Sequence, residues 1–590
     1  MGVSTLIPGH KKLSVPSFTI LIGGVDVTAK YGIVSVMVNK SINRVPVAEV
    51  VLYDGSAAKQ DFELSNKPDF VPGSDVIIKA GYAQIEKKIF EGIVTRFSIK
   101  APLNAPSTLM LEIRDKSAKM TINRKNKYFA DKTDSDIMKS VIQESGLQAD
   151  VASTTATHKE MVQYYATDWD FVLSRAEANG LLVFVEDGKV SIQKPVFALK
   201  GDSLNLQYGD NIVDIEAEMD ARDQYGDVTA KDWDYSKQEV VEKKATPPSM
   251  GKEEGNISGK DLSDVLGVSD YLLQSPVKML DAELTAWASA KLLRSRMSKI
   301  KGRVRIYGTN AIKPGDVINL MGVGKRFNGA AYCSSVVHSY GAHSTWYTDI
   351  IFGFSQEWFY EKYDNIVDKG SAGLLPAVNG LVTGIVTDIV DEEGGEFRVR
   401  VRIPLIDNGD KGVWARIVAA DAGNDRGILI RPEKDDEVIL GFVNDDPRDP
   451  VILGMLYSKK NKVPAELTPD KDNKIKGWIT KSKIKFLIDD DKKTVTVITP
   501  AKNKIVLDDD KKSITLEDQN KNKIVMDDKG ILMDTPKDFV VNAKGKITLT
   551  GTKDVTAESK SGKLVVKGTS SAEISASGST TVKGATVKIN

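Results

Sequence analysis

The residues of this chain whose types and spacing could hold a metal ion are its histidines and two acidic clusters. Among the four histidines, His338 and His343 are five residues apart, which would suit a metal pair or two ordinary residues of a strand and turn. Two runs, Asp489 to Asp491 and Asp508 to Asp510, resemble calcium ligands in their charge. Because the runs recur at one position of a repeat, we interpret them as its corners, with cation binding as the alternative. We predict no metal site and no cofactor.

Signals for nucleotide binding and for catalysis are weaker. The segment Gly322-Val323-Gly324 lacks the following helix that a dinucleotide site needs, so a turn is the better interpretation. Cys333 is the single cysteine and follows an apolar run, which is typical of a small buried side chain and excludes a disulfide within the chain. No pair of carboxylates can be placed as the acid and base of a hydrolase, so we predict no catalytic residue and no enzymatic activity.

Length and charge narrow the class of protein. A chain of 590 residues has a prior expectation of about four domains. Its 81 basic and 81 acidic residues balance, so the basic excess typical of nucleic-acid binders is missing and we expect no nucleic-acid partner. Neither a Sec signal peptide nor a run of about 18 apolar residues is evident, which predicts assembly in the cytoplasm.

Short strands and three helices are the elements that would position these residues. Residues 17–100 alternate in short β-rich runs that Gly and Pro punctuate. Helices are predicted to begin at Thr133-Asp134, at Asp168 and near Asp281, with Asp168 as an N-cap and Trp169 in the core. The polar segment from Lys243 to Gly267 is expected to be a long exposed loop or insertion.

One local pattern occurs twice in the first part of the chain. Pro72-Gly73-Ser74-Asp75-Val76 leads to Phe90-Glu91-Gly92 and a further strand, and Pro314-Gly315-Asp316-Val317 leads to Phe327-Asn328-Gly329 and another strand. Turns and strands are common enough for this to be a coincidence. The alternative is two copies of one small β-barrel with helical material between them, so that three chains would present six similar units in a ring.

The segment from Gly380 to Leu456 has its own strand pattern. Five short strands are predicted, at residues 382–389, 397–403, 413–418, 437–442 and 451–454. About 75 residues with five short strands fit a small closed barrel of the OB type.

The C-terminal part of the chain is a repeat. Lys483-Ile484-Lys485-Phe486, Asn503-Lys504-Ile505-Val506 and Asn522-Lys523-Ile524-Val525 recur about every 20 residues, each followed by aspartates. Each strand offers only two or three apolar side chains on one face, too few to offset about 1–2 kcal/mol of backbone entropy per residue in a single chain. We therefore predict that three chains wind into one narrow shaft, with a disordered polar tail as the alternative.

In their order, these segments resemble the VgrG family of type VI secretion spikes and the hub-spike proteins of phage-tail-like contractile injection systems. The resemblance covers nearly the whole chain. It includes the first barrel motif, the helix motif from Gln163 to Gly180, the second barrel motif and a dense series in the OB-like segment. The residues that carry these structural motifs are Phe90, Gly92, Asp168, Trp169, Phe171, Arg175, Gly180, Phe327, Gly329, Trp414, Arg416, Glu437, Pro447 and Gly454.

The resemblance implies a homotrimer whose tandem barrels form a pseudo-sixfold platform between a hexameric inner tube and a threefold needle. It also implies baseplate partners, effector cargo, transient contact with a target membrane, and a PAAR-like tip protein bound at Val587, Lys588, Ile589 and Asn590. Some phage relatives carry a lysozyme domain between the OB fold and the needle. Here only Tyr457 to about Lys481 separates them, which is too short, and no effector domain is expected after the needle.

The predicted fold is mainly β with some α: tandem small β-barrels with helical insertions, an OB-like barrel and an intertwined triple-stranded β-helix. We assign residues 1–120 to a first hub barrel, 121–210 to a mixed α+β region, 211–370 to a second barrel with an insertion near 243–267, 371–460 to the OB-like barrel and 461–590 to the needle. The predicted function is the spike and baseplate hub of a contractile injection system, which punctures a membrane mechanically and is ejected or released outside the cell. The alternative is a trimeric phage-tail-like fibre or adhesin that binds a cell surface.

Overall fold

The computed structural model describes residues 15–28, 30–251, 254–341, 344–390 and 395–589. Strands far outnumber helices in it, so the predicted mainly β fold with some α is confirmed. The chain divides into two compact units: Met1–Val378 with Asn444–Pro447, and Asn379–Val443 with Arg448–Asn590.

Seven strands open the first unit, and their inward side chains form one hydrophobic core. Alternate residues such as Ile20, Ile22, Val76 and Ile78 are fully buried, as the period of two in a half-buried strand requires. The strands are β1 (Pro16–Ile22), β2 (Val25–Asp26), β3 (Ile33–Ser41), β4 (Val47–Tyr53), β5 (Asp75–Tyr82), β6 (Ile85–Lys100) and β7 (Thr108–Arg114).

A mixed α/β region follows, and both of its helices begin at a threonine. The Oγ1 of Thr133 accepts the N–H of Asp136, and the Oγ1 of Thr167 accepts the N–H of Asp170. The predicted helix starts are confirmed, but Asp168 is the first helical residue rather than the N-cap, because Thr167 already caps the first turn. The elements are β8 (Arg124–Thr133), α1 (Asp134–Glu144), β9 (Gln148–Val151), β10 (Thr157–Thr167), α2 (Asp168–Ala178), β11 (Leu182–Glu186) and β12 (Lys189–Gln193).

The remainder of the first unit contains the third expected helix, α4 (Asp281–Met297). The expected loop between Lys243 and Gly267 is partly wrong, since it contains α3 (Gly259–Leu266). Its polar composition conceals a capping box of Ser258 and Asp261 and a buried Leu262. The other elements are β13 (Asn205–Gln207), β14 (Ile212–Met219), β15 (Asp227–Asp234), β16 (Glu239–Lys244), β17 (Asp270–Gln274), β18 (Ile300–Tyr307), β19 (Val317–Met321), β20 (Gly329–Tyr340), β21 (Trp346–Phe352) and α5 (Phe359–Lys362).

One sheet connects the two halves of this unit, and one strand connectivity occurs in it twice. The thirteen-stranded sheet runs β14-β18-β21-β20-β3-β4-β7-β6-β5-β1-β2, with β19 also paired to β20 and β13 to β19. Its first five-strand group has the order β3-β4-β7-β6-β5. The second group has the order β14-β18-β21-β20-β19. In both groups the strands, counted along the chain, lie in the spatial order first, second, fifth, fourth, third.

The turns that lead into these groups have the same hydrogen bonds. Gly73 donates its N–H to the carbonyl of Val94, and Gly315 donates its N–H to the carbonyl of Cys333, both at 2.8 Å. Both glycines have a positive φ, 103° and 94°, a conformation that a side chain would strain. The Pro-Gly pattern seen in the sequence therefore marks two equivalent turns.

The bulges of the two groups also correspond. Immediately after those bonded positions, Thr95 bulges from β6 and Ser334 bulges from β20. Each bulged hydroxyl donates to a carbonyl of the neighbouring strand at 3.2 Å, Thr95 to Glu112 and Ser334 to Ile351. Shared turns, bulges and register favour a duplicated unit over a coincidence of turn and strand patterns.

Five strands of the second unit close into a barrel, which confirms the predicted OB-like segment. Val386, Val399, Val401 and Leu440 are fully buried in its core. The barrel consists of β22 (Val382–Asp388), β23 (Val399–Arg402), β24 (Val413–Ile417), β27 (Glu437–Phe442) and β28 (Pro450–Met455), with β25 (Ala422–Gly423) and β26 (Arg426–Gly427) paired beside it.

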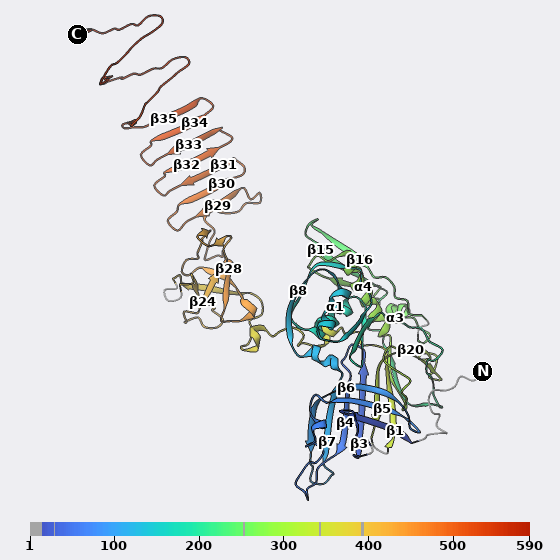
Figure 1. The fold of residues 1–590 in the computed structure, drawn as a ribbon. Helices are drawn as coiled ribbons and strands as arrows, with labels where there is room; N and C mark the ends of the chain where they lie inside the picture. Colours follow the sequence, from blue (N-terminus) through green and yellow to red (C-terminus); the bar gives the residue numbers. More distant parts are fainter. Residues whose placement is uncertain (1–14, 29, 252–253, 342–343, 391–394, 590) are drawn as a thin grey trace. The chain divides into compact units, whose positions relative to one another are not determined.

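Seven strands then stack in sequence order as an antiparallel meander (Figure 1). They are β29 (Ile475–Ile479), β30 (Lys485–Asp489), β31 (Thr494–Ile498), β32 (Lys504–Asp508), β33 (Ser513–Glu517), β34 (Lys523–Asp527) and β35 (Gly530–Asp534), and we call them the needle sheet. Pairing of these strands within one chain was not expected from the sequence. Residues 536–589 are exposed and contain no strand in the described chain, so the intertwined β-helix stays a prediction for them.

Candidate functional site

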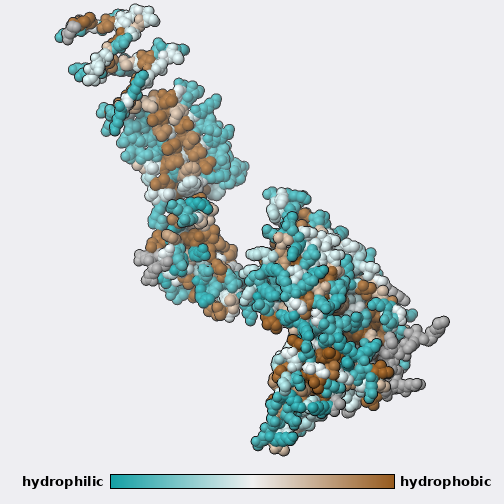
Figure 2. All heavy atoms as spheres, viewed as in Figure 1, coloured by the Kyte–Doolittle hydropathy of each residue, from teal (hydrophilic) through white to brown (hydrophobic). Residues whose placement is uncertain are grey.

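The needle sheet has one face that is apolar except for Lys476 in its first strand. Cross-strand pairs such as Val495 with Leu507 and Leu507 with Ile514 place apolar side chains opposite one another in every strand. Figure 2 shows the resulting hydrophobic band across the stacked strands, between hydrophilic margins. The thirteen residues of this apolar face are Trp478, Phe486, Ile488, Val495, Val497, Ile505, Leu507, Ile514, Leu516, Ile524, Met526, Ile531 and Met533.

The apolar face is largely exposed in the single chain. Leu507 is 44% exposed, and Ile531 and Met533 at the last strand are 68% and 57% exposed. A contiguous apolar patch of this extent marks a protein or membrane contact on a soluble protein. The apolar face is therefore the strongest candidate interface in the described chain.

The opposite face of the needle sheet carries charges at the strand ends. Lys485, Lys504 and Lys523 begin three alternate strands, and Asp489, Asp508 and Asp527 end the same strands. Between them lie small or apolar side chains such as Thr496, Val506, Thr515 and Val525. The needle sheet is thus amphipathic, with water expected on this second face.

The aspartate runs lie at turns, as interpreted from the sequence. Asp489 accepts the backbone N–H groups of Asp491 and Lys492, and Asp508 accepts the backbone N–H and the side-chain ammonium of Lys511, both at 2.9 Å. Hydrogen bonds from the backbone N–H of Lys492 lower the pKa of Asp489, and the Lys511 ammonium and N–H lower that of Asp508. These carboxylates stabilise the strand turns, and within the described residues no group of three His, Cys, Asp or Glu is placed to hold a metal ion.

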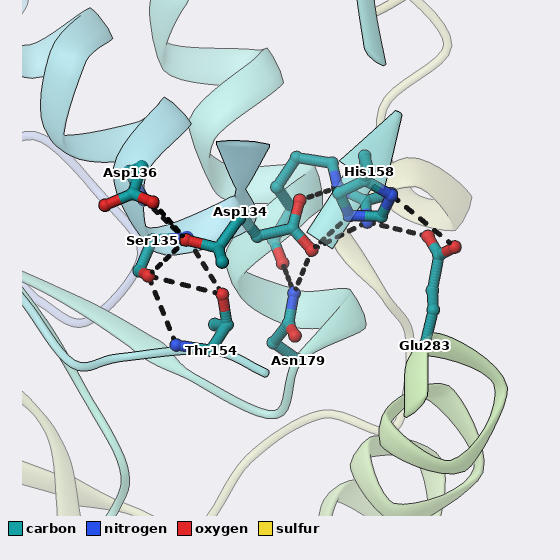
Figure 3. Close-up of polar contacts among 9 residues, drawn as sticks. Asp134, Ser135, Asp136, Thr154, His158, Asn179 and Glu283 are labelled. Carbon is teal, nitrogen blue, oxygen red and sulfur yellow. Dashed lines mark hydrogen bonds and ion pairs between the residues drawn. The ribbon is translucent and has the colours of Figure 1, made fainter. Parts of the chain in front are cut away.

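A buried charged cluster connects the helices of the first unit (Figure 3). Asp134, fully buried at the start of α1, accepts hydrogen bonds from Arg175 at 2.7 and 2.9 Å and from Asn179 at 2.9 Å. A ring nitrogen of His158 on β10 lies 3.1 Å from the same carboxylate. Arg175 also donates to Glu283 of α4 at 2.8 Å, so the cluster fastens α1, α2, α4 and β10 together.

Electrostatics of this cluster favour its ionised form. Burial alone would raise the pKa of Asp134, but the hydrogen bonds and charge of Arg175, with Asn179 and His158, hold it below its usual value. Burial opposes the charge of Arg175, yet Asp134 and Glu283 raise its pKa. Such an ion network positions helices: Asp134 is fully buried, and the side chain of Glu283 is 16% exposed.

The predicted motif residues of α2 lie in or beside this cluster. Asp168 is buried and accepts hydrogen bonds from Gln163 and Ser145, both at 3.1 Å. Trp169 is buried in the core, and Phe171 stacks on Phe129 with ring centroids 5.9 Å apart. Gly180 follows the helix with a φ of 65°. A Cβ added at this glycine would lie 3.4–3.5 Å from the Cα and Cβ of Ala290 on α4.

The strand motifs of the first unit have packing roles. Phe90 is buried in the first core, and a Cβ on Gly92 would meet the carbonyl of Arg114 at 2.4 Å. Phe327 packs against the core around Ile318, and Gly329 begins β20 with a φ of 131°.

In the OB-like barrel, the motif residues lie mostly on the outside. Trp414 is half-buried beneath the guanidinium of Arg400, at 5.6 Å, while Arg416 two positions on is exposed. Glu437 begins β27 and is half-buried, as are Pro447 and Gly454.

The remaining candidates have ordinary surroundings. His338 is buried and its Nδ1 lies 3.1 Å from the Thr348 hydroxyl, while burial and the nearby Lys40 lower its pKa to about 3. His343 and Asn590 lie outside the described residues. Gly322 and Gly324 form a turn, and the Cys333 thiol is buried with a raised pKa. Val587, Lys588 and Ile589 are exposed.

The sequence reading missed Asp134, His158 and Glu283 as members of one cluster. A signal did exist at Asp134, because an acidic residue directly after an N-cap threonine is often placed for electrostatics with the helix. Nothing in the spacing of His158 or Glu283 marks them, since their side chains meet only through tertiary packing. No helix of the described chain is long and apolar enough to cross a bilayer.

Residues 12–341, more than half of the chain, match the family model of the Alg8 N-terminal domain. The chain belongs to this Alg8 family. In the Alg8-family chain, residues 382–457 also match the model of the type VI secretion system/phage-baseplate injector OB domain, and this range contains the closed barrel.

Curated relatives of this Alg8-family chain are VgrG spike proteins, so the resemblance drawn from the motifs is confirmed. The type VI secretion system spike protein VgrG1b of Pseudomonas aeruginosa is 23% identical over 363 residues, covering 56% of this chain and 47% of that protein. VgrG5 of the same organism is 29% identical over 107 residues, covering 17% and 14%. The chain thus matches less than half of the length of either relative.

Similar solved structures include tail and spike proteins. The prophage MuSo2 43 kDa tail protein from Shewanella oneidensis has a TM-score of 0.44 and 13% identity, covering 57% of this Alg8-family chain and 98% of that chain. A chain of the half-lidded Francisella PdpA–VgrG complex has a TM-score of 0.37 and 12% identity, covering 88% and 87%.

Proposed function

We propose that this protein is the homotrimeric hub and spike of a contractile injection system, and that it works by mechanical puncture. The single observation that carries the proposal is the exposed apolar face of the needle sheet. A single chain leaves this face in water, whereas association of several copies would bury it. Relatives named as type VI spike proteins support the same role.

The width of the needle sheet is compatible with three copies. Five residues per strand give a width of about 17 Å, and a triangle of that side has its centre about 5 Å from each face. Because packed sheets lie about 10 Å apart, about 5 Å per sheet is the spacing at which facing side chains fill the core. Four sheets of the same width would leave a hollow centre.

The duplicated five-strand unit supports a hub role. Three chains with two such units each provide six similar units, enough to match a sixfold inner tube, while one needle sheet per chain gives threefold symmetry below it. In this proposal the hub domains keep the boundaries expected from the sequence. Baseplate proteins, the inner tube protein, a PAAR-like tip protein at Val587 to Ile589, and effector cargo are its partners.

The proposed role needs no bond chemistry, because the sheath supplies the work and this chain supplies stiffness. Backbone hydrogen bonds run along the stacked strands and resist bending of the shaft. The motif residues stabilise the parts that bear load and contact no substrate. Incubation with purified peptidoglycan should release no soluble fragments, and measurable turnover would contradict a purely mechanical role.

The mass of the native particle tests the proposal. We expect a species of three times the chain mass of 64.4 kDa by native mass spectrometry and by light scattering at micromolar concentration. Its assembly with sheath and baseplate proteins should be visible by co-purification. A stable monomer at high concentration would contradict the proposed function.

A further inference from the structure

The two long margins of the needle sheet carry opposite charge. At one margin, which we call the basic edge, seven lysines of the strand ends and turns accompany three acidic residues. At the other margin, the acidic edge, eight aspartates accompany five lysines between Asp489 and Lys529. The basic edge contains Lys481, Lys483, Lys485, Lys502, Lys504, Lys521 and Lys523 with Glu517, Asp518 and Asp534. The acidic edge contains Asp489, Asp490, Asp491, Asp508, Asp509, Asp510, Asp527 and Asp528 with Lys492, Lys493, Lys511, Lys512 and Lys529.

The antiparallel meander creates this asymmetry. Successive turns alternate between the margins, so the turns at residues 480–484, 499–503 and 518–522 lie on the basic edge and those at 490–493, 509–512 and 528–529 on the acidic edge. Because the sequence repeat spans two strands, each margin receives the same part of the repeat every time. Charges at equivalent positions of the repeat therefore stay on one side.

Part of this charge is balanced within the chain. Lys504 pairs with Glu517 along the basic edge, and Lys511 pairs with Asp508 along the acidic edge, both at 2.9 Å. Other residues remain available: Lys502, Lys521, Asp510 and Asp528 are exposed and have no ion pair within the described residues. The opposite sign of the two edges thus persists after the internal pairs are made.

Threefold closure would bring unlike edges together. A rotation axis repeats one contact in the same direction around the ring, so the right margin of each sheet meets the left margin of the next in a heterologous contact. Like margins meet only across a twofold axis. With the apolar faces turned inward, each corner of the shaft would then bring the Lys502 turn near the Asp510 turn, about one strand spacing apart along the axis.

We propose that neighbouring copies of the needle sheet associate along heterologous corners, with the basic edge of one copy against the acidic edge of the next. This inference rests on the proposed trimer and specifies the contact that holds it. The apolar face drives association, while the paired edges fix the direction of each contact between copies. The two edges are offset by one strand, so without an axial shift each basic turn would lie between two acidic turns of the next copy.

Cysteine crosslinking of the full chain tests this contact. Ala501→Cys and Asp510→Cys are placed on exposed turns of the basic and acidic edges. A bis-maleimide shorter than the width of the sheet cannot join the two positions within one chain, because the strands span about 17 Å between them. The parent chain, whose one cysteine Cys333 is buried, is the control.

The expected products distinguish the alternatives. The double variant should give covalent dimers and trimers, and each single variant should stay monomeric in denaturing gels. Dimers from a single variant, or a double variant that forms native trimers without crosslinks, would overturn the heterologous corner while the proposed trimer stands. A native monomer of the unmodified chain would overturn both.

A charge-swap series gives a second test that does not depend on crosslinking. Lys502→Glu with Lys521→Glu should raise the concentration at which the trimer dissociates by tenfold or more in low salt, because the basic edge would lose its positive excess and place carboxylates against the acidic edge. Adding Asp510→Lys and Asp528→Lys should recover at least half of this loss on the logarithmic scale. Failure of the second pair to restore the trimer would contradict the proposed pairing.

Discussion

At Asp134, the first unit contains a carboxylate that is fully buried and held by Arg175, Asn179 and His158. An ion network of this kind is strongly destabilised when one partner is removed, because the remaining charge stays buried without compensation. This explains physically why an arginine at position 175 is part of the recognisable α2 motif. Its importance lies in joining helices, not in chemistry.

Replacing Arg175 with Met should destabilise the hub by about 3–5 kcal/mol at pH 7, since it leaves the Asp134 charge unpaired. Arg222→Ala is the matched control, because Arg222 pairs with Asp220 at the surface and its loss should have a small effect. Thermal unfolding followed by tryptophan fluorescence measures both. Equal midpoints for the two variants would contradict this role for Arg175.

The same pair should give a defined pH dependence. The pKa of Asp134 is lowered in the folded chain, so its stabilising contribution is present above the unfolded value near 3.9 and is lost as pH falls through the folded value. We therefore expect the difference between the Arg175→Met variant and the parent chain to shrink as pH falls below about 4 and through the lowered folded pKa of Asp134. A difference that grows with acidification would contradict the assigned ionisation.

His338 should make the hub sensitive to mild acid. Its folded pKa, lowered to about 3, lies below the unfolded value near 6.5, so its contribution is complete above 6.5 and is lost as pH falls from there. The slope attributable to one proton is about 1.4 kcal/mol per pH unit between pH 6 and 4. Exchange to His338→Gln should remove this slope from the pH dependence of thermal unfolding, and an unchanged slope would contradict it.

In the needle sheet, the alternation of side chains separates two functions. From β30 to β35, the same five-residue strands place only apolar residues on one face and a charged frame on the other. A sheet with one exposed apolar face is stable only when that face is covered. The repeat thus gives the needle sheet an apolar face that is suited to contact between copies.

Leu507→Lys and Thr515→Lys compare these faces within adjacent strands. Leu507 belongs to the apolar face, so a trimer would bury three ammonium groups in a narrow core, and we expect loss of the trimer or aggregation. Thr515 belongs to the opposite face, where lysine should leave the native mass unchanged. Native mass spectrometry of both variants decides, and a stable trimer of Leu507→Lys would contradict the inward apolar face.

Across the whole molecule, strand patterns recur in two places: a five-strand order in the first unit and a stack of short strands in the second. The first unit repeats a five-strand group with its turns and bulges, whereas the needle sheet repeats a two-strand unit along the stack. Six hub groups and three needle sheets in one trimer would reconcile sixfold with threefold symmetry. The change of symmetry then comes from the number of repeats per chain.

Truncation shows which part of the chain holds three copies together. Removing residues 535–590 leaves the apolar face of β29–β35 intact, so the shortened chain should remain trimeric. Removing residues 458–590 deletes that face, and we expect a monomer or a much weaker trimer. Sedimentation of both proteins at the same concentration measures this, and a monomeric 1–534 chain would place the decisive contacts in the final segment.

The sequence by itself determined the local elements and the capping residues and turns that bound them. The three helices, the five-stranded barrel and the aspartate turns follow from capping residues, alternation and repeat length, because these signals act between residues close in the chain. The two Pro-Gly turns gave the first sign of duplication for the same reason. Helix α3 was missed because a polar composition outweighed its capping box.

Only the tertiary structure decided which distant residues meet. His158, Asp134 and Glu283 converge through the packing of a strand and two helices, and no spacing in the chain encodes that distance. Pairing of β3 with β20 into one sheet, and of β29 to β35 within one chain, likewise depends on which edges are left open once local folding is complete. Burial and strand pairing depend on contacts between residues far apart in the chain. They are therefore decided by the folded structure and not by the local sequence.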